Sequence, residues 1–326
     1  MEPKDVTDLA ARIGSGERRT LAKAITLIES SRADHQLLAQ SLLARLLPHT
    51  GRALRVGVSG VPGAGKSTFI EALGLHLIGA GHRVAVLAVD PSSAVSGGSI
   101  LGDKTRMPRL AASDRAFIRP SPSSGALGGV GRHTREAILA VEAAGFDVVL
   151  VETVGVGQSE HLVASMVDTF LLLALAGAGD ELQGIKRGIL ELVHVIAINK
   201  ADGDGRERAE RTRAEYQSAL RLLRGEDAPW VPKLACVSAL EERGIDTIWQ
   251  HVRDHRAFLE STGRLGEVRD AQRRGWLLGL LREALEHELR EHPSVKAMAP
   301  DIEREVSEGI ITPTEGARRL LELYRT

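Results

Sequence analysis

The sequence predicts an α/β fold in which a mainly parallel central sheet is flanked by helices, with helical extensions at both ends of the chain. Two observations predict it. Short apolar, β-branched runs alternate with longer mixed segments, and a glycine-rich loop directly follows the first run. Ligands of such sheets bind at the carboxyl ends of the strands. The predicted strands cover residues 54–58, 84–89, 116–118, 148–151, 169–175, 193–198 and 234–237.

Helical patterns lie on either side of these strands. Before residue 51, apolar residues recur at helical spacing, and after residue 261 a leucine stripe repeats every fourth position. We therefore predict a helical extension over residues 1–50, a core domain over 51–262 and a helical arm suited to dimerisation over 263–326. The positions that carry the two patterns are Leu21, Ala24, Ile25, Ile28, Leu277, Leu281, Leu285 and Leu289.

Composition excludes several classes of protein. In 326 residues, 42 Lys plus Arg balance 43 Asp plus Glu, so bulk charge gives no case for a nucleic-acid or anionic-membrane partner. The single cysteine, Cys236, excludes an intramolecular disulfide, and residues 1–5 lack the pattern of a secretory signal. The most apolar run, 170–176, is too short to span a membrane. We expect a cytoplasmic protein.

The glycine-rich loop has the spacing G-x-x-x-x-G-K-S and lies between a predicted strand and a predicted helix, which is the context of a phosphate-binding loop. Its glycines allow backbone N–H groups to face the β-phosphate, and the following helix adds its positive dipole end. Lys66 can bridge β- and γ-phosphate oxygens, and Ser67 can ligate Mg²⁺. The predicted phosphate contacts are Gly60, Val61, Pro62, Gly63, Ala64, Gly65, Lys66, Ser67 and Thr68.

Guanine recognition is predicted from the segment Asn199-Lys200-Ala201-Asp202, which follows the strand 193–198. The Asp202 carboxylate can accept two hydrogen bonds from the guanine N1 and exocyclic amine, a donor pair that adenine lacks. After the next strand, Ser238, Ala239 and Leu240 can place backbone N–H groups against the guanine carbonyl. The pair of motifs therefore predicts binding of GTP and GDP.

Candidate metal and switch residues lie at or beyond the ends of other strands, and they are Asp90, Asp103, Glu152 and Gly155. Mg²⁺ prefers octahedral oxygen ligands and keeps several waters, so the Ser67 hydroxyl with one or two carboxylates suffices. Glu152 is the first candidate for the metal or its water shell, and the Gly155 N–H for sensing the γ-phosphate. Asp90 and Asp103 are also compatible with a turn-capping role.

Hydrolysis is predicted to be slow. Val156 stands where many GTPases carry the glutamine that orients the attacking water, and the role of nearby Gln158 is open. The segment 177–188 combines glycine with paired charges, which suits a switch loop but also a solvated connection between strand and helix. Its predicted switch residues are Gly177, Asp180, Glu181, Gln183 and Lys186.

Two further features favour structural roles. His251 and His255 have the i, i+4 spacing of metal ligands, but without a nearby third ligand we interpret them as part of a solvated helix face. Cys236 lies in an apolar run, where a buried packing residue is a better interpretation than a nucleophile.

Taken together, these motifs resemble the MeaB/ArgK family of GTPases, the bacterial counterparts of the human methylmalonic aciduria type A protein. The resemblance covers most of the chain, and its motifs thin out beyond residue 241. It is carried by Ala24-Ile-Thr and by the segments 60–68, 86–93, 97–107, 119–125, 151–160, 177–191 and 199–202.

The resemblance implies a homodimeric GTPase that assists an adenosylcobalamin-dependent acyl-CoA mutase, usually methylmalonyl-CoA mutase, by gating cofactor loading and protecting or reactivating the mutase. It maps Ser67, Asp90, Asp103 and Glu152 onto magnesium and switch positions, and 177–188 onto the loop that transmits nucleotide state, with Lys186 as its nucleotide-responsive residue. Two alternatives remain. One is a nickel-inserting GTPase, although His-rich or Cys-His metal-storage tracts are absent from the sequence. The other is an ATP-dependent kinase or transport ATPase.

Overall fold

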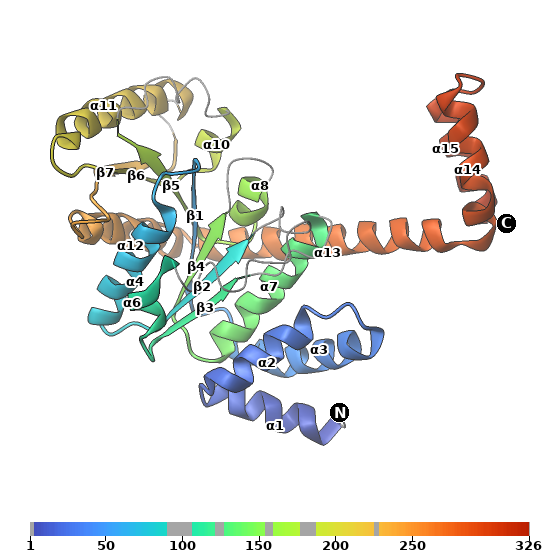
Figure 1. The fold of residues 1–326 in the computed structure, drawn as a ribbon, viewed down its shortest axis with the longest axis horizontal. Coiled ribbons are helices and arrows are strands. Elements are labelled where there is room, and N and C mark those ends of the chain that lie inside the picture. Colours follow the sequence, from blue (N-terminus) through green and yellow to red (C-terminus); the bar gives the residue numbers. More distant parts are fainter. Residues whose placement is uncertain are drawn as a thin grey trace. The chain divides into compact units, whose positions relative to one another are not determined.

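The computed structural model of this protein describes residues 3–89, 106–120, 127–153, 159–176, 187–224 and 228–325. Its backbone divides into two compact units, Met1–Asp270 and Ala271–Thr326, and Figure 1 colours them along the sequence. This division has one boundary, whereas the sequence predicts two, after residues 50 and 262. The three-segment organisation therefore stays a prediction.

One seven-stranded sheet forms the centre of the first unit, and every neighbouring pair of strands is parallel. The strand order is β3-β2-β4-β1-β5-β6-β7, which places β1 between β4 and β5. Each predicted strand corresponds to an observed one, so the predicted α/β class is confirmed. The strands are β1 (Leu54–Gly60), β2 (Val84–Val89), β3 (Ala116–Pro120), β4 (Val148–Thr153), β5 (Thr169–Leu175), β6 (Val195–Asn199) and β7 (Lys233–Cys236).

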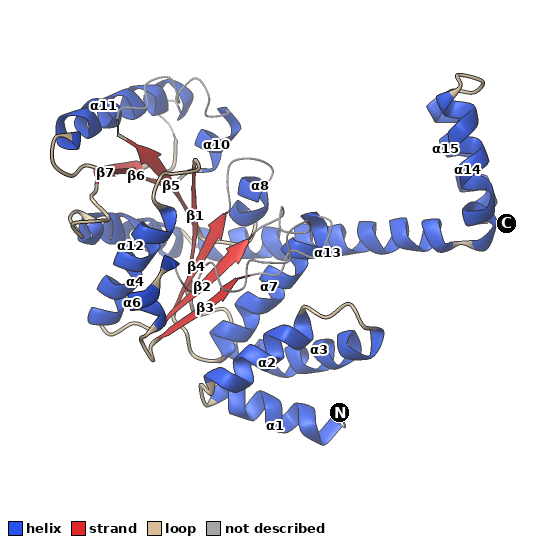
Figure 2. Ribbon diagram, in the orientation of Figure 1, coloured by secondary structure: helices blue, strands red, loops and turns tan. Residues whose placement is uncertain are grey.

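Helices cover both faces of the sheet (Figure 2). Alternating strand residues explain this arrangement, because successive side chains of a strand point to opposite faces. In β5, Leu171 and Leu173 pack with α4 (Lys66–Gly79), α6 (Pro108–Ala111) and α12 (Ile245–Ser261). Phe170 and Leu172 belong to the opposite core, which includes residues of α7 (Leu127–Ala143), α8 (Ser159–Ala164), α10 (Arg187–Leu192) and α11 (Gly205–Arg224).

The predicted N-terminal helical extension is confirmed. It consists of α1 (Pro3–Gly14), α2 (Arg18–Ile28), α3 (Ala33–Leu46) and the short 3₁₀ helix η1 (Leu47–His49). All three α-helices of the extension contact α7. The apolar positions that predicted the extension, Leu21, Ala24, Ile25 and Ile28, are buried in that contact layer.

The C-terminal residues are helical, as predicted. They comprise α13 (Arg264–Glu291), α14 (Pro293–Ser307) and α15 (Pro313–Arg325). Within the second unit α14 and α15 pack together, with Arg319 Nη1 3.0 Å from Glu305 Oε2. Glu315 N donates to Thr312 Oγ1 at 3.2 Å, a side-chain cap that starts α15.

The apolar stripe of α13 is exposed in its second half. Leu277, Leu278, Leu281 and Leu285 expose 66%, 60%, 52% and 51% of their surface. Exposed apolar faces of this kind are typical of surfaces that bind a partner. Within the described ranges, no helix is both long enough and apolar enough to cross a membrane.

Candidate nucleotide-binding site

The glycine-rich loop connects the carboxyl end of β1 to the first turn of α4, as the sequence predicted. Two of its glycines are required by their surroundings. At Gly60 a Cβ would collide with the carbonyl oxygen of Leu173. At Gly65, φ is +85° and a Cβ would lie 2.8 Å from the side-chain nitrogen of Asn199. The loop therefore lies tightly between β5 and the last residue of β6.

Lys66 lies inside this loop. Its Nζ donates to the carbonyl oxygens of Gly60 at 2.7 Å and Val61 at 3.2 Å. Burial lowers the pKa of Lys66, while the neighbouring carboxylates of Glu152 and Glu160 oppose that change and Arg106 adds to it. The loop thus holds the Lys66 amine at the amino end of α4, where the helix dipole also attracts anions.

An oxygen-rich pair lies next to Lys66. Ser67 Oγ donates to Glu152 Oε1 at 3.3 Å, and Glu152 is only 5% exposed at the end of β4. The adjacent Thr153 Oγ1 donates to Ser59 Oγ at 2.9 Å, which anchors the end of β4 to β1. A hydroxyl and a carboxylate at this distance are hard oxygen donors of the kind that Mg²⁺ prefers.

Asn199 joins the two predicted recognition segments to the phosphate-binding loop. Its side chain is 2% exposed, and its Nδ2 donates to Ala64 O at 2.8 Å. Its Oδ1 accepts from Ala239 N at 3.1 Å. One amide side chain therefore connects three loops that are far apart in the sequence.

The two loops that follow β6 and β7 also contact each other directly. Ala201 N donates to Val237 O at 3.0 Å, and Ser238 Oγ donates to Asp202 Oδ1 at 3.1 Å. Lys200 adopts a left-handed conformation with φ of +61°, and Leu240 is 78% exposed. The structure thus brings Asn199, Asp202 and the 238–240 segment together beside the phosphate-binding loop.

Several predicted site residues lie outside the described ranges, so the structure makes no statement about them. They are Asp90, Asp103, Gly155, Val156, Gln158, Gly177, Asp180, Glu181, Gln183 and Lys186.

Two charged residues without a predicted role affect the pKa of Lys66. Glu160 is fully buried in the first turn of α8, and Arg106 directly precedes the buried Met107 and α6. Glu71 of α4 holds this segment, because its Oε1 accepts from Arg109 N at 2.7 Å and Leu110 N at 3.2 Å. Arg106 and Glu160 fall within the segments 97–107 and 151–160, which carried the family resemblance. That resemblance was the signal in the sequence that could have identified them.

The histidine prediction is wrong for His255. This residue is 2% exposed, stacks on His194 with ring centroids 4.1 Å apart, and has its Nδ1 2.8 Å from Thr169 Oγ1. Burial lowers its pKa to about 4. Cys236 is half-buried, and burial together with Glu210 raises its pKa to about 11, so the thiol stays protonated at neutral pH.

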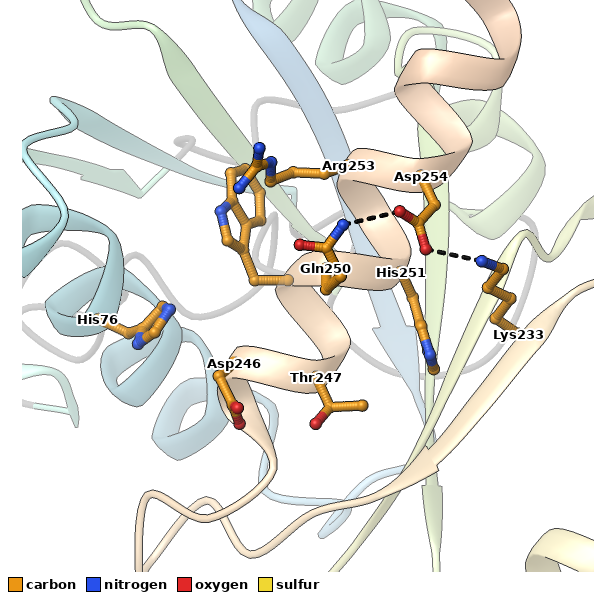
Figure 3. Close-up of a pocket in the computed structure, with 9 residues that line it drawn as sticks. His76, Lys233, Asp246, Thr247, Gln250, His251, Arg253 and Asp254 are labelled. Atoms are coloured by element: carbon orange, nitrogen blue, oxygen red, sulfur yellow. Dashed lines mark hydrogen bonds and ion pairs between the residues drawn. The ribbon is translucent and has the colours of Figure 1, made fainter.

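A hollow of about 530 Å³ lies along α12, away from these loops (Figure 3). It is lined by His76 from the last turn of α4, by Lys233 at the start of β7 and by residues of α12. Lys233 Nζ donates to Asp254 Oδ2 at 2.6 Å. None of the predicted site residues within the described ranges lines this hollow.

Comparison with known proteins assigns the chain to a family. The family model described as "Methylmalonyl Co-A mutase-associated GTPase MeaB" matches residues 21–294. The chain is 50% identical to "GTPase ArgK" of Escherichia coli, covering 97% of this chain and 95% of that protein. It is 47% identical to "Methylmalonic aciduria type A homolog, mitochondrial" of Mus musculus, covering 100% and 81%.

A solved structure supports the same assignment. The crystal structure of an LAO/AO transport system kinase is 41% identical, with a TM-score of 0.81 and coverage of 100% of this chain and 99% of that one. Relatives and family model therefore agree over almost the whole length, and the protein belongs to the MeaB family of methylmalonyl Co-A mutase-associated GTPases.

Proposed function

We propose that this protein binds and hydrolyses GTP and acts as a chaperone of an adenosylcobalamin-dependent acyl-CoA mutase of the methylmalonyl-CoA mutase type. In this role it gates cofactor loading and protects or reactivates the mutase. Family membership supports the GTPase activity. The names of the family and of the mammalian relative support the link to the mutase.

The observation that carries the nucleotide assignment is the pair of hydrogen bonds made by the Asn199 side chain to Ala64 and Ala239. They hold the phosphate-binding loop and both base-recognition loops in one arrangement. A nucleotide bound there places its phosphates at Lys66 and its base at Asp202. The Asp202 carboxylate then accepts from the guanine N1–H and exocyclic amine, and adenine leaves that acceptor unpaired.

The residues present fit a magnesium ion. Ser67 Oγ and Glu152 Oε1 would hold it or its water shell, and the sequence adds Asp90 and Asp103 as further carboxylates. A bound Mg²⁺ would neutralise part of the charge on the phosphate oxygens of the nucleotide. Lys66 contributes its own positive charge to the same oxygens, and the Gly155 amide, we propose, senses the γ-phosphate.

Intrinsic turnover is proposed to be slow, on the order of 10⁻² s⁻¹ or below, since Val156 stands in place of a water-orienting glutamine. We propose that the mutase stimulates it through the segment 177–188, in which Gly177, Asp180, Glu181, Gln183 and Lys186 respond to the nucleotide. The protein is proposed to be a cytoplasmic homodimer whose C-terminal helices form the dimer contact. The exposed leucines of α13 support that contact.

The decisive experiment measures GTP turnover and adenosylcobalamin transfer with and without purified acyl-CoA mutases. We expect at least one mutase to form a complex, to raise the turnover rate and to show nucleotide-dependent cofactor loading. Absence of a complex, of stimulation and of any effect on loading with every mutase would refute the chaperone role. ATP binding as tight as GTP binding would refute the guanine assignment separately.

A base-switch variant tests the guanine assignment at one atom. In Asp202→Asn the side-chain amide can donate to the C2 carbonyl of xanthine, whereas it no longer accepts both guanine donors. We expect preference to change from GTP to XTP. Lys66→Ala is the matched variant, because it removes a phosphate contact and should weaken turnover of either base without changing the order of preference.

A further inference from the structure

We infer that Arg243 is a positioning residue for guanine recognition, whose guanidinium holds the carbonyl of Ala201 and thereby orients the Asp202 carboxylate toward the base. The inference rests on the proposed binding of GTP. It deepens that proposal by identifying a residue outside both recognition motifs that sets the selectivity of the site.

Arg243 belongs to the loop after β7 and binds the loop after β6. Its backbone pairs with Ser238 through two hydrogen bonds, Arg243 N to Ser238 O and Ser238 N to Arg243 O, both at 3.0 Å. Its Nη2 donates to Ala201 O at 2.6 Å. The side chain therefore crosses from the loop after β7 to the loop after β6.

The contact matters because of where Ala201 lies. The Ala201 N–H is anchored by Val237 O at 3.0 Å, and its carbonyl is anchored by Arg243. The carbonyl of Ala201 belongs to the same planar peptide unit as the N–H and Cα of Asp202, so fixing it restrains the position of the Cα from which the Asp202 side chain leaves the backbone. The peptide on each side of Ala201 is thus held by the neighbouring loop.

Lys200 shows why such an anchor is needed. Its φ of +61° lies in the left-handed region, which an L residue other than glycine adopts only when the surroundings hold it there. Beyond Ala201, Ser238 Oγ donates to Asp202 Oδ1 at 3.1 Å and restrains the carboxylate itself. Without the Arg243 contact, the strained backbone that precedes Asp202 would lose one of its two cross-loop bonds.

A competing interpretation is that Arg243 serves only as half of a surface ion pair. Its Nη2 lies 3.0 Å from Glu241 Oε2, and the two side chains are 48% and 45% exposed. Exposed pairs of this kind contribute little to stability. Glu241→Gln removes the ion pair and keeps the donor to Ala201, so it is the matched control.

The experiment measures dissociation constants for GDP and IDP, together with GTP turnover at saturating substrate, in the full-length protein. IDP lacks the exocyclic amine that Asp202 would bind. The ratio of the IDP dissociation constant to the GDP dissociation constant therefore reports how well the carboxylate is placed. In Arg243→Ala we expect GDP to bind about tenfold more weakly, IDP to change less, and the ratio to fall about threefold or more. Saturated turnover should stay within about twofold of wild type.

Arg243→Lys should restore part of the ratio, because an ammonium on a long stem can still donate to Ala201 O, and Glu241→Gln should keep the wild-type ratio. An unchanged ratio in Arg243→Ala, or an equal loss in Glu241→Gln, would overturn the inference. Thermal unfolding of each variant excludes a general loss of folding as the cause. If wild type itself does not prefer GDP to IDP, the guanine assignment fails, which is a distinct result.

Discussion

At the amino ends of the strands, the carboxylate of Asp168 is completely buried and is bound by Arg269 and Arg256. At the carboxyl ends, Lys66 Nζ donates to two carbonyl oxygens of the phosphate-binding loop, and the Asp202 carboxylate accepts a hydrogen bond from the Ser238 hydroxyl. The first group has its charge neutralised within the protein, whereas the second keeps charges that a ligand can bind. The same sheet therefore carries a structural charge cluster at one end and a recognition site at the other.

The structural cluster is dense. Arg269 donates from Nε and Nη2 to Asp168 at 2.8 Å each, and from Nη2 to Ala53 O at 2.7 Å. Arg55 N donates to Asp168 Oδ2 at 3.0 Å. Burial by itself would lower the pKa of Arg269, but the hydrogen bonds and charge of Asp168 outweigh that effect and raise it. The cluster ties the start of α13 to β1 and β5.

Removing the central carboxylate should have the largest effect. Asp168→Ala removes the carboxylate that the buried guanidinium of Arg269 binds, so we expect the free energy of unfolding to fall by about 3–5 kcal/mol. Urea unfolding measures it. Asp114→Ala is the control, since Asp114 is fully exposed beside Arg18 and should change stability by less than about 1 kcal/mol. Similar losses in the two variants would show that the buried carboxylate contributes no more to stability than an exposed one.

The opposite result is expected at the recognition end. Lys66→Ala should lower GTP turnover on the order of 10²–10³-fold, because it removes a fixed positive charge from the phosphate oxygens. Stability should change by about 1 kcal/mol or less. Single-turnover kinetics and urea unfolding check both statements. Lys233→Ala, which removes an ammonium that pairs with Asp254 instead, should leave turnover at the wild-type level.

The pH dependence of stability should come partly from the amino end. His255 contacts Thr169 there, and its folded pKa of about 4 lies below the ordinary value of 6.5. As pH falls below 6.5, the unfolded chain binds a proton that the folded protein does not, so stability decreases. Between pH 7.5 and pH 5 the expected loss from this group is about 2 kcal/mol.

Urea unfolding at the two pH values, for wild type and His255→Asn, measures that contribution. The variant should lose correspondingly less stability between them. An identical loss of stability between the two pH values in both proteins would show that His255 is not the group responsible. It would also show that burial does not lower the pKa of its imidazole.

The smallest effect is expected at the contact between the two base loops. Ser238→Ala removes the hydroxyl that donates to Asp202 and accepts from Glu241 N at 3.1 Å. We expect GDP affinity to decrease by about 1 kcal/mol, measured by calorimetry. Ser218→Ala, which removes an exposed hydroxyl bonded within α11, should have no effect on affinity. An unchanged affinity in Ser238→Ala would mean that the hydroxyl does not position Asp202.

The sequence by itself determined the features that depend on neighbouring residues. The loop 60–67 and the segment 199–202 are recognisable because their chemistry requires fixed spacing within a few residues. The strands are recognisable because burial on both faces demands continuous apolar runs. These local requirements predicted the α/β class and the nucleotide-binding loops, and the motifs that meet them carried the resemblance to the family.

Only the tertiary structure decided which distant residues meet. Asn199 contacts Ala64 across 135 positions, and Arg269 contacts Asp168 across 101. Arg243 reaches Ala201 from another loop, and His255 is buried although the sequence, with no third metal ligand nearby, suggested a solvated helix face. A side chain's partner across such separations depends on how strands are ordered and helices packed, and no spacing along the chain records that order.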